Sequence, residues 1–324
     1  MKKKNLLFLL LLMALLSWPL IWHKQPQQTL SGPALEYLTY KEVIFTNRFD
    51  STQLAGMLFL PEQTDSFPVV VIIQGSGTSK RTNPWYLSVA QYLQQSGIGV
   101  LLPDKRGSEQ SGGRWQEQPL EVLATDTESA IDYLKQESRL PISSMGIMGM
   151  SQGGWVAPIV AAHRPDITFV IDMSGSLTTS DEQLKFEEYH NIRPYTYDFI
   201  AHWLAPLTSK LLARKPHIAA LLGFDPIPYW QQIKAPVLIA FGENDTNCPV
   251  KQSLQNIEQK SLQHFTVKVY PDGGHAIADP ASNRVSADFL HDLQNFIIAA
   301  DGHLDSLAMK LISIAKTINQ QSIQ

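Results

Sequence analysis

Residues 145–162 read MGIMGMSQGGWVAPIVAA, and this stretch decides the fold. An apolar run from Met145 to Met148 leads into Gly149-Met-Ser-Gln-Gly153, and an apolar, helix-compatible run continues to Ala162. The pattern G-x-S-x-G is typical of a sharp turn from a strand into a helix that lifts the serine hydroxyl above a sheet. Glycine suits this turn because a missing side chain lets it close. The five residues alone are a weak signal, so their neighbours decide what they mean.

The segments around this turn alternate between strand-like and helix-like patterns. Val69-Val-Val-Ile-Ile73 is a β-branched run without polar alternation, which is typical of a strand buried on both faces of a parallel sheet. Two strand-like stretches precede it, as in an antiparallel start to a sheet. The strands are predicted near 41–45, 54–60, 69–73, 97–102, 145–150, 167–173, 237–241 and 266–270, and the helices near 86–95, 124–136, 153–162, 251–259 and 287–299. This order predicts an α/β fold, a mostly parallel sheet covered by helices on both faces.

Between residues 174 and 233 the alternation stops. This interval has no convincing strand pattern, and its helix-compatible segments are rich in aromatic residues. We expect it to form a helical cap insertion, within a catalytic domain made of residues 39–173 and 234–300. We also expect a polar, proline-containing linker at 25–38 and a C-terminal amphipathic helix within residues 301–324.

Residues 1–24 predict export. Lys2, Lys3 and Lys4 precede an uncharged, leucine-rich run from Leu6 to Trp22. The run is longer than an ordinary signal-peptide core and just long enough to span a bilayer, and no small-x-small pair directly follows it. We therefore expect a membrane anchor, with the rest of the chain across the cytoplasmic membrane. The alternative is a cleaved signal peptide that leaves a secreted or periplasmic protein.

Composition excludes several classes of function. The chain of 324 residues is 44% hydrophobic and 17% charged with a net charge of −4, which is a globular balance. Basic blocks do not recur after the N-terminus, so we expect no nucleic acid partner.

The single cysteine, Cys248, excludes an internal disulfide and a cysteine-based zinc site, and we interpret it as a small packing residue. The sequence implies no cofactor and no metal, and it specifies no oligomeric state.

A serine hydroxyl becomes a nucleophile when a base takes its proton and a carboxylate orients that base. In the chain order typical of this turn, both partners follow the serine. His275 lies after the last predicted sheet strand, in a glycine-containing loop that leaves it free to reach Ser151. Asp245 follows the preceding strand and is the predicted acid, with Glu243 as its competitor. Asp272 is too close to His275 along the chain to be favoured.

Attack by a serine creates an oxyanion that needs preorganised N–H donors. One donor is normally the backbone N–H after the nucleophile, which belongs to Gln152. The second normally comes from the loop after the strand at 69–73, which reads Gln74-Gly-Ser-Gly77. We predict the backbone N–H of Ser76 as this second donor, although a plain turn after a strand would use the same residue types.

Taken together, these segments resemble the α/β-hydrolase superfamily over Tyr40 to Ala300. Within it they resemble the bacterial esterases grouped with serine aminopeptidase-like and acyl-thioester-hydrolase-like proteins. Residues 102–112, LPDKRGSEQSG, are similar to the loop after the family's fourth strand, where Asp-x-Arg-Gly is common and structural. The family usually has His-Gly where this chain has Gln74-Gly75, so the oxyanion loop departs from the pattern. The resemblance also implies that the insertion is the family's cap.

The sequence predicts a serine hydrolase that cleaves carboxylic esters of short or medium acyl groups in small-molecule substrates. Ser151 would form the acyl-enzyme, His275 would move the proton and Asp245 would hold the imidazole. The alternatives are a serine aminopeptidase-like peptidase, in which Glu187 and Glu188 would hold a protonated amine, and an acyl thioesterase. An alternative from another class is a non-catalytic binding protein on the same scaffold.

Overall fold

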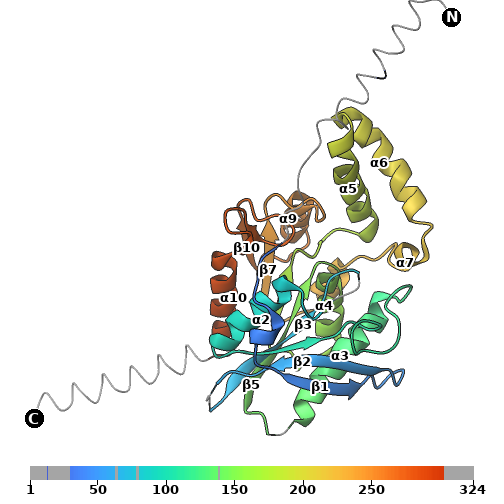
Figure 1. The fold of residues 1–324 in the computed structure, drawn as a ribbon. Coiled ribbons are helices and arrows are strands. Elements are labelled where there is room, and N and C mark those ends of the chain that lie inside the picture. Colours follow the sequence, from blue (N-terminus) through green and yellow to red (C-terminus); the bar gives the residue numbers. More distant parts are fainter. Residues whose placement is uncertain (1–12, 14–29, 63–64, 78–79, 138, 303–324) are drawn as a thin grey trace, which may run out of the picture.

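The central sheet is mostly parallel. The computed structural model describes residue 13 and residues 30–302, except 63–64, 78–79 and 138. Eight strands form one sheet in the order β1-β2-β4-β3-β5-β6-β7-β8 (Figure 1). Strand β2 pairs with β1 and β4 in the antiparallel sense, and all remaining neighbours in this sheet are parallel. The sheet predicted from the sequence is therefore confirmed.

The elements lie close to the predicted ranges. The sheet strands are Lys41–Thr46 (β1), Gln53–Phe59 (β2), Phe67–Ile73 (β3), Gly99–Pro103 (β4), Ile142–Met150 (β5), Phe169–Met173 (β6), Val237–Gly242 (β7) and Thr266–Tyr270 (β8). A separate pair consists of Ala278–Asp279 (β9) and Arg284–Val285 (β10). The α-helices are Pro84–Gln95 (α2), Leu120–Gln136 (α3), Gln152–His163 (α4), Ser180–Ile192 (α5), Asp198–Leu212 (α6), Pro216–Ala219 (α7), Ile227–Trp230 (α8), Val250–Gln259 (α9) and Ala287–Ala300 (α10). Two 3₁₀ turns are Leu35–Tyr37 (η1) and Arg193–Tyr195 (η2).

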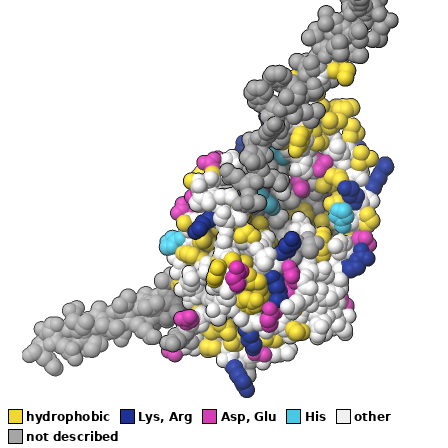
Figure 2. Space-filling view, in the orientation of Figure 1, with side chains coloured by type: hydrophobic (Ala, Val, Ile, Leu, Met, Phe, Trp, Pro, Cys, Tyr) yellow, Lys and Arg dark blue, Asp and Glu magenta, His cyan; other side chains and the backbone are white. Residues whose placement is uncertain are grey.

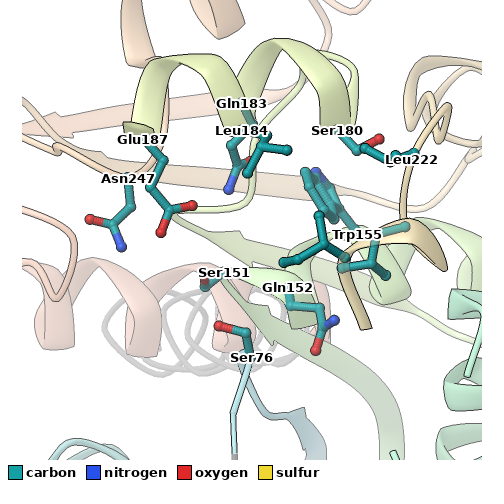
Figure 3. Close-up of a pocket in the computed structure, with 12 residues that line it drawn as sticks. Ser76, Ser151, Gln152, Trp155, Ser180, Gln183, Leu184, Glu187, Leu222 and Asn247 are labelled. Atoms are coloured by element: carbon teal, nitrogen blue, oxygen red, sulfur yellow. The ribbon is translucent and has the colours of Figure 1, made fainter. Parts of the chain in front are cut away.

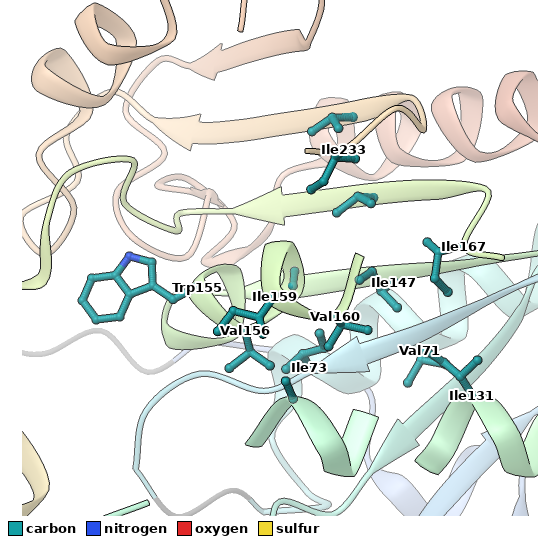
Figure 4. Close-up of a cluster of buried hydrophobic side chains, with 14 of the residues drawn as sticks. Val71, Ile73, Ile131, Ile147, Trp155, Val156, Ile159, Val160, Ile167 and Ile233 are labelled. Atoms are coloured by element: carbon teal, nitrogen blue, oxygen red, sulfur yellow. The ribbon is translucent and has the colours of Figure 1, made fainter. Parts of the chain in front are cut away.

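Strand β3 shows how the sheet divides the core. All of its residues are buried. Val69, Val71 and Ile73 pack in a cluster with α3 and α4, part of which Figure 4 shows. Val70 and Ile72 pack in a second cluster with α2 and α10. Because both faces of the strand are covered, apolar residues occupy every position, and this explains the absence of alternation in its sequence.

Two buried arginines, Arg106 within the stretch 102–112 and Arg81 outside it, connect this stretch to other parts of the chain. Arg106 donates hydrogen bonds to both carboxylate oxygens of Asp126, at 2.9 and 2.6 Å, and to Asp50 at 2.5 Å. Asp104 in turn accepts two hydrogen bonds from Nε of Arg81, at 2.9 and 3.1 Å. Buried guanidinium groups are stable only when paired in this way. The Asp-x-Arg-Gly stretch therefore has a structural role, as the resemblance implied.

Residues 174–233 leave the sheet between the neighbouring strands β6 and β7 and contain α5 to α8 (Figure 1). The chain closes on itself at the base of this insertion. The N–H of Ser180 donates to the carbonyl oxygen of Phe224 at 3.0 Å, and the N–H of Phe224 donates to Oγ of Ser180 at 3.2 Å. The N–H of Gly223 also donates to Asp181 at 2.7 Å. These bonds form a neck that joins α5 and α6 to the rest of the domain.

Part of the stretch predicted as a linker packs on the domain. Leu30, Leu35 and Leu38 lie against the cluster that contains α2 and α10. The N–H of Ser31 donates to the carbonyl oxygen of Asn283 at 2.7 Å. The leucines have no regular spacing, and the polar and proline residues between them conceal their burial at the sequence level.

Two predicted segments cannot be compared with the structure. The apolar run from Leu6 to Trp22 lies outside the described residues, except for Met13, and so does the predicted C-terminal helix at 303–324. Within the part of the chain that the structure describes, no helix combines the length and apolar character needed to cross a membrane. The anchor and the C-terminal helix stay predictions.

Strand β6 carries a buried carboxyl group, that of Asp172. It is fully buried, and its Oδ1 accepts the N–H of Gly175 at 2.9 Å. Its Oδ2 has no hydrogen-bond partner among the described residues. Burial raises the pKa of Asp172 well above its ordinary value, and the single backbone hydrogen bond opposes this only in part. The folded state therefore favours the protonated, neutral carboxyl group.

We predict that Asp172→Asn preserves or raises the free energy of unfolding at pH 8. Because the folded-state pKa is raised, the wild type loses stability as pH rises from the unfolded-state pKa, near 4, through the folded-state pKa. An amide has a similar shape and cannot ionise. Urea unfolding at pH 5 and pH 8 should show a fall that is larger for the wild type by about 1 kcal/mol or more. Asp172→Ala, which leaves a cavity, should be less stable at both pH values. Equal pH dependence in wild type and Asp172→Asn would contradict the neutral carboxyl group.

Candidate active site

Three loops at one edge of the sheet carry the predicted catalytic residues. Ser151 follows β5 directly, Asp245 lies in the loop after β7, and His275 lies in the loop after β8. Strands β5, β6, β7 and β8 run parallel to one another, so these loops emerge at the same, carboxyl edge. Binding sites in open parallel sheets typically lie at this edge.

The turn at Ser151 needs glycine on both sides. Ser151 has φ 53° and ψ −116°, a strained conformation for a residue with a side chain. A Cβ atom on Gly149 would lie 2.2 Å from the carbonyl oxygen of Gly153. A Cβ atom on Gly153 would lie 2.1 Å from the carbonyl oxygen of Ile73. These short distances exclude any residue larger than glycine at positions 149 and 153. The missing side chains let the start of α4 lie against the end of β3.

A hydrogen-bond chain joins the three predicted residues. His275 Nε2 lies 2.9 Å from Ser151 Oγ, and His275 Nδ1 lies 2.8 Å from Asp245 Oδ2. The Asp245 side chain is fully buried, and its Oδ1 accepts the N–H groups of Asn247 and Cys248 at 2.7 and 2.9 Å. The carboxylate is thus fixed on one side and available to the imidazole on the other. With the proton on Nδ1, Nε2 is left to accept the serine proton.

The competing carboxylates lie elsewhere. Glu243 is exposed and makes no hydrogen bond to His275. Asp272 is also exposed, and its Oδ1 accepts a hydrogen bond from Asn244 at 3.0 Å. The structure therefore places Asp245 and neither alternative beside the histidine. The catalytic roles of the three residues stay predictions that activity measurements must test.

Asp245→Asn should lower kcat by about 10³- to 10⁴-fold, because an amide no longer selects the imidazole tautomer that accepts the serine proton. The matched variant Glu243→Gln should stay within about twofold of the wild type, since its side chain faces solvent. Steady-state hydrolysis of a chromogenic ester measures both. Thermal unfolding checks that Asp245→Asn remains folded, since this residue also accepts two backbone N–H groups. The reverse ranking would assign the acid to Glu243.

The two predicted oxyanion donors lie beside the serine. Ser76 and Gln152 line the same cavity as Ser151 (Figure 3). Neither backbone N–H is bonded to an acceptor within the described ranges. The carbonyl oxygen of Gly75 accepts a hydrogen bond from Lys105 Nζ at 2.7 Å. Because C=O and N–H point in opposite directions across a trans peptide, this bond fixes the direction of the Ser76 N–H.

Lys105 is a buried amine that sequence reasoning missed. Its Nζ donates to the Gly75 carbonyl and, at 2.7 Å, to Oε1 of Gln152, and it lies 4.5 Å from the centre of the Trp115 ring. Burial lowers the pKa of Lys105 to about 7. The side chain therefore connects the oxyanion loop with the residue that follows Ser151. It occupies the variable position of Asp-x-Arg-Gly, so the motif itself carries no signal for this role.

We predict that Lys105→Met lowers kcat about tenfold and changes KM less than twofold, because the Ser76 N–H loses its fixed direction while the substrate cavity remains. Lys135 lies on α3 and forms an exposed ion pair with Asp166, so Lys135→Met is the matched control and should change neither constant. Equal kcat values for wild type and Lys105→Met would mean that the Tyr86 hydroxyl, which accepts the Gly75 N–H at 2.8 Å, is sufficient to hold the loop.

A cavity of about 170 Å³ lies over Ser151, between α4 and the insertion. Its two ends differ. In Figure 3, Glu187 and Asn247 lie at one end, and Trp155 and Leu222 lie at the other. The remaining lining residues are Ser76, Gln152, Ser180, Gln183, Leu184, Ile218 and Leu221. The cavity thus offers an apolar end and a polar end on opposite sides of the serine.

The two adjacent glutamates of α5 have different surroundings. Glu187 lines the cavity, and burial raises its pKa, with the nearby His275 acting in the opposite direction. Glu188 does not line the cavity and accepts a hydrogen bond from Asn191 at 3.2 Å. Of the two residues that could hold an amine, the structure places only Glu187 near Ser151.

A G-x-S-x-G turn of this shape, meeting a histidine and an acid at the carboxyl edge of a mostly parallel sheet, defines the α/β-hydrolase class. Solved structures of other proteins have the same fold. An esterase of Pyrococcus furiosus superimposes with a TM-score of 0.61 at 19% identity, covering 84% of this chain and 98% of the esterase. An acylaminoacyl peptidase of Pyrococcus horikoshii superimposes with a TM-score of 0.59 at 17% identity, covering 81% and 41%. At these identities the likeness shows the fold alone.

Within that class, the chain belongs to the prolyl oligopeptidase family, which matches residues 84–300. The human acylamino-acid-releasing enzyme is 25% identical over 260 residues, which cover 71% of this chain and 32% of that enzyme. A thiohydrolase of Aspergillus aculeatus is 31% identical over 140 residues, covering 43% and 42%. The chain spans about a third of the length of the acylamino-acid-releasing enzymes. The protein is thus a member of a serine hydrolase family.

Proposed function

We propose that the protein hydrolyses carboxylic esters of short or medium acyl groups. The observation that carries this proposal is the end of the cavity at which Trp155 and Leu222 lie, together with the apolar side chains of Leu184, Ile218 and Leu221 in the rest of the lining. An acyl chain gains about 0.8 kcal/mol for each methylene group that it buries in such surroundings. The volume of about 170 Å³ is below that of pockets for drug-sized ligands, which favours short chains.

The proposed mechanism follows from the hydrogen-bond chain. Ser151 Oγ attacks the acyl carbon while His275 Nε2 takes its proton, and Asp245 stabilises the imidazolium that forms. The N–H groups of Gln152 and Ser76 bind the oxyanion. His275 then gives the proton to the leaving alcohol, and an acyl-Ser151 ester remains. Water attacks this ester by the same steps, which releases the acid and restores the serine.

A peptidase is the second candidate, and Glu187 is the observation that favours it. A partly buried carboxylate at the polar end of the cavity would pair with the protonated amine of a substrate. Relatives named as acylamino-acid-releasing enzymes, and one named a dipeptidyl-peptidase, support the same candidate. The thiohydrolase among the relatives supports acyl thioesters as a third substrate class.

A comparison of substrates on one purified protein tests these candidates. We expect the highest kcat/KM with p-nitrophenyl esters of short or medium chains, about 10²-fold above aminoacyl p-nitroanilides and above acyl-CoA thioesters. Ser151→Ala should abolish all of these activities and the reaction with a fluorophosphonate probe, because each depends on the same nucleophile.

The glutamate pair provides the matched controls for this comparison. If anilides have the highest kcat/KM, and Glu187→Gln removes that preference while Glu188→Gln does not, the protein is an amine-binding peptidase and the ester proposal is wrong. If thioesters have the highest kcat/KM, the third candidate replaces it.

A further inference from the structure

Helix α6 exposes a continuous apolar stripe to solvent. Phe199, Trp203, Leu207 and Leu211 are 72%, 69%, 45% and 60% exposed. Their spacing of four residues places them in one row along the helix. Large apolar side chains gathered on one exposed face usually mark an interaction site.

The opposite face of α6 is the one that packs on the protein. Ala201, Ala205 and Ser209 are buried, and α6 packs on α5. Each of these small residues lies two positions from a member of the stripe, which is about 200° around the helix. The face of the helix that is fully buried therefore carries small side chains, and four large apolar side chains point outward, while Ile200, Leu204 and Leu212 are half-buried. This is the reverse of the usual pattern for a helix on a water-soluble domain.

Basic side chains follow the stripe. Lys210, Arg214 and Lys215 are exposed, and none has a carboxylate partner in the described part of the chain. Residues 199–224 contain no Asp or Glu at all. In Figure 2, hydrophobic side chains gather at the top of the described surface, over α5 and α6, and basic side chains lie along the adjoining edge. The surface thus combines an apolar row with three exposed basic side chains that have no carboxylate partner among the described residues.

We propose that α6 docks on the surface of a phospholipid bilayer that contains anionic lipids. The stripe would enter the boundary between headgroups and acyl chains, where aromatic side chains such as Trp203 and Phe199 are favoured. Lys210, Arg214 and Lys215 would contact lipid phosphates. At a rise of 1.5 Å per residue, the row from Phe199 to Leu211 presents about 18 Å of helix to such a surface. A second copy of the chain would fit less well, because residues 199–224 offer no acidic partner for the basic side chains.

The continuous part of the described chain begins at Leu30, at the same edge of the sheet as the insertion. Ser31 is bonded to Asn283, in the turn between β9 and β10 that follows the His275 loop. The predicted apolar segment ends at Trp22, and the residues from there to Leu30 span at most about 28 Å. If that segment is an anchor, it holds this edge of the domain close to a membrane.

Spin labelling of the full-length protein tests the proposal. A nitroxide is attached to Leu207→Cys and, as the matched control, to Glu62→Cys, an exposed position between β2 and β3 at the other edge of the sheet. The native Cys248 does not compete, because it is fully buried and burial raises its pKa. The protein is reconstituted in phosphatidylcholine vesicles with about 30% phosphatidylglycerol. Accessibility to oxygen, which dissolves in lipid, is compared with accessibility to a water-soluble nickel complex.

The proposal requires the label at 207 to favour oxygen and the label at 62 to favour nickel. A triple charge reversal, Lys210→Glu with Arg214→Glu and Lys215→Glu, should return the label at 207 to water while hydrolysis of a soluble ester changes less than twofold. A nickel-accessible label at 207 in the otherwise unchanged protein would overturn the proposal. So would a label shielded from both reagents, which would show that protein covers the stripe. In that case, spin–spin broadening would identify a second copy as the cover, and its absence would identify a segment of the same chain.

Discussion

The site depends on the positive φ of Ser151. Such a conformation costs about 1–3 kcal/mol in a residue with a side chain, and the packing of β5 and α4 must offset it. The same turn brings α4 so close to β3 that Gly153 lies against the backbone of Ile73. A Cβ atom on Gly75, just beyond β3, would lie 3.4 Å from the Cβ atom of Ser151. One strained turn therefore positions both the nucleophile and the loop that would bind the oxyanion.

Three ionisable groups near this turn are buried, and they differ in the number of hydrogen bonds that they make. Asp245 accepts two backbone N–H groups on Oδ1 and contacts the histidine through Oδ2, so both of its oxygens have partners. Asp172 accepts a single backbone N–H and is favoured in its neutral form. Lys105 donates to two oxygens, although its burial opposes the charge. Burial therefore opposes the charged forms of both Asp172 and Lys105, despite the hydrogen bonds that each of them makes.

The features that the sequence predicts well are those that depend on a few consecutive residues. The β-branched run of β3 and the order strand, Ser151, helix are each contained in a few consecutive residues, and both were confirmed in the fold. Asp245 was the predicted acid, with Glu243 as its competitor because the two residues lie two positions apart after the same strand. The tertiary structure distinguishes them, because Asp245 contacts His275 and is held by the N–H groups of Asn247 and Cys248, whereas Glu243 is exposed.

The sequence patterns did not predict features that arise from tertiary packing. The role of Lys105 depends on contacts with residues far away in the sequence, so no local pattern marks it. The burial of Leu30, Leu35 and Leu38 follows from the surface on which they pack. Strands β9 and β10 contain two residues each, too few for any alternation to be detected.

The neck between Ser180 and Phe224 separates the α5–α6 hairpin from the sheet. Strands β6 and β7 are already neighbours, so the sheet needs only a connection between them, whatever its length. Because backbone hydrogen bonds close that connection at its base, residues beyond the neck can be exchanged without changing strand register. Grafting of the α5–α6 hairpin from a relative, with its ends joined at these two residues, would transfer the roof of the cavity as a module. The lining of the cavity above Ser151 can then change while the strands and loops that carry the three predicted catalytic residues stay as they are.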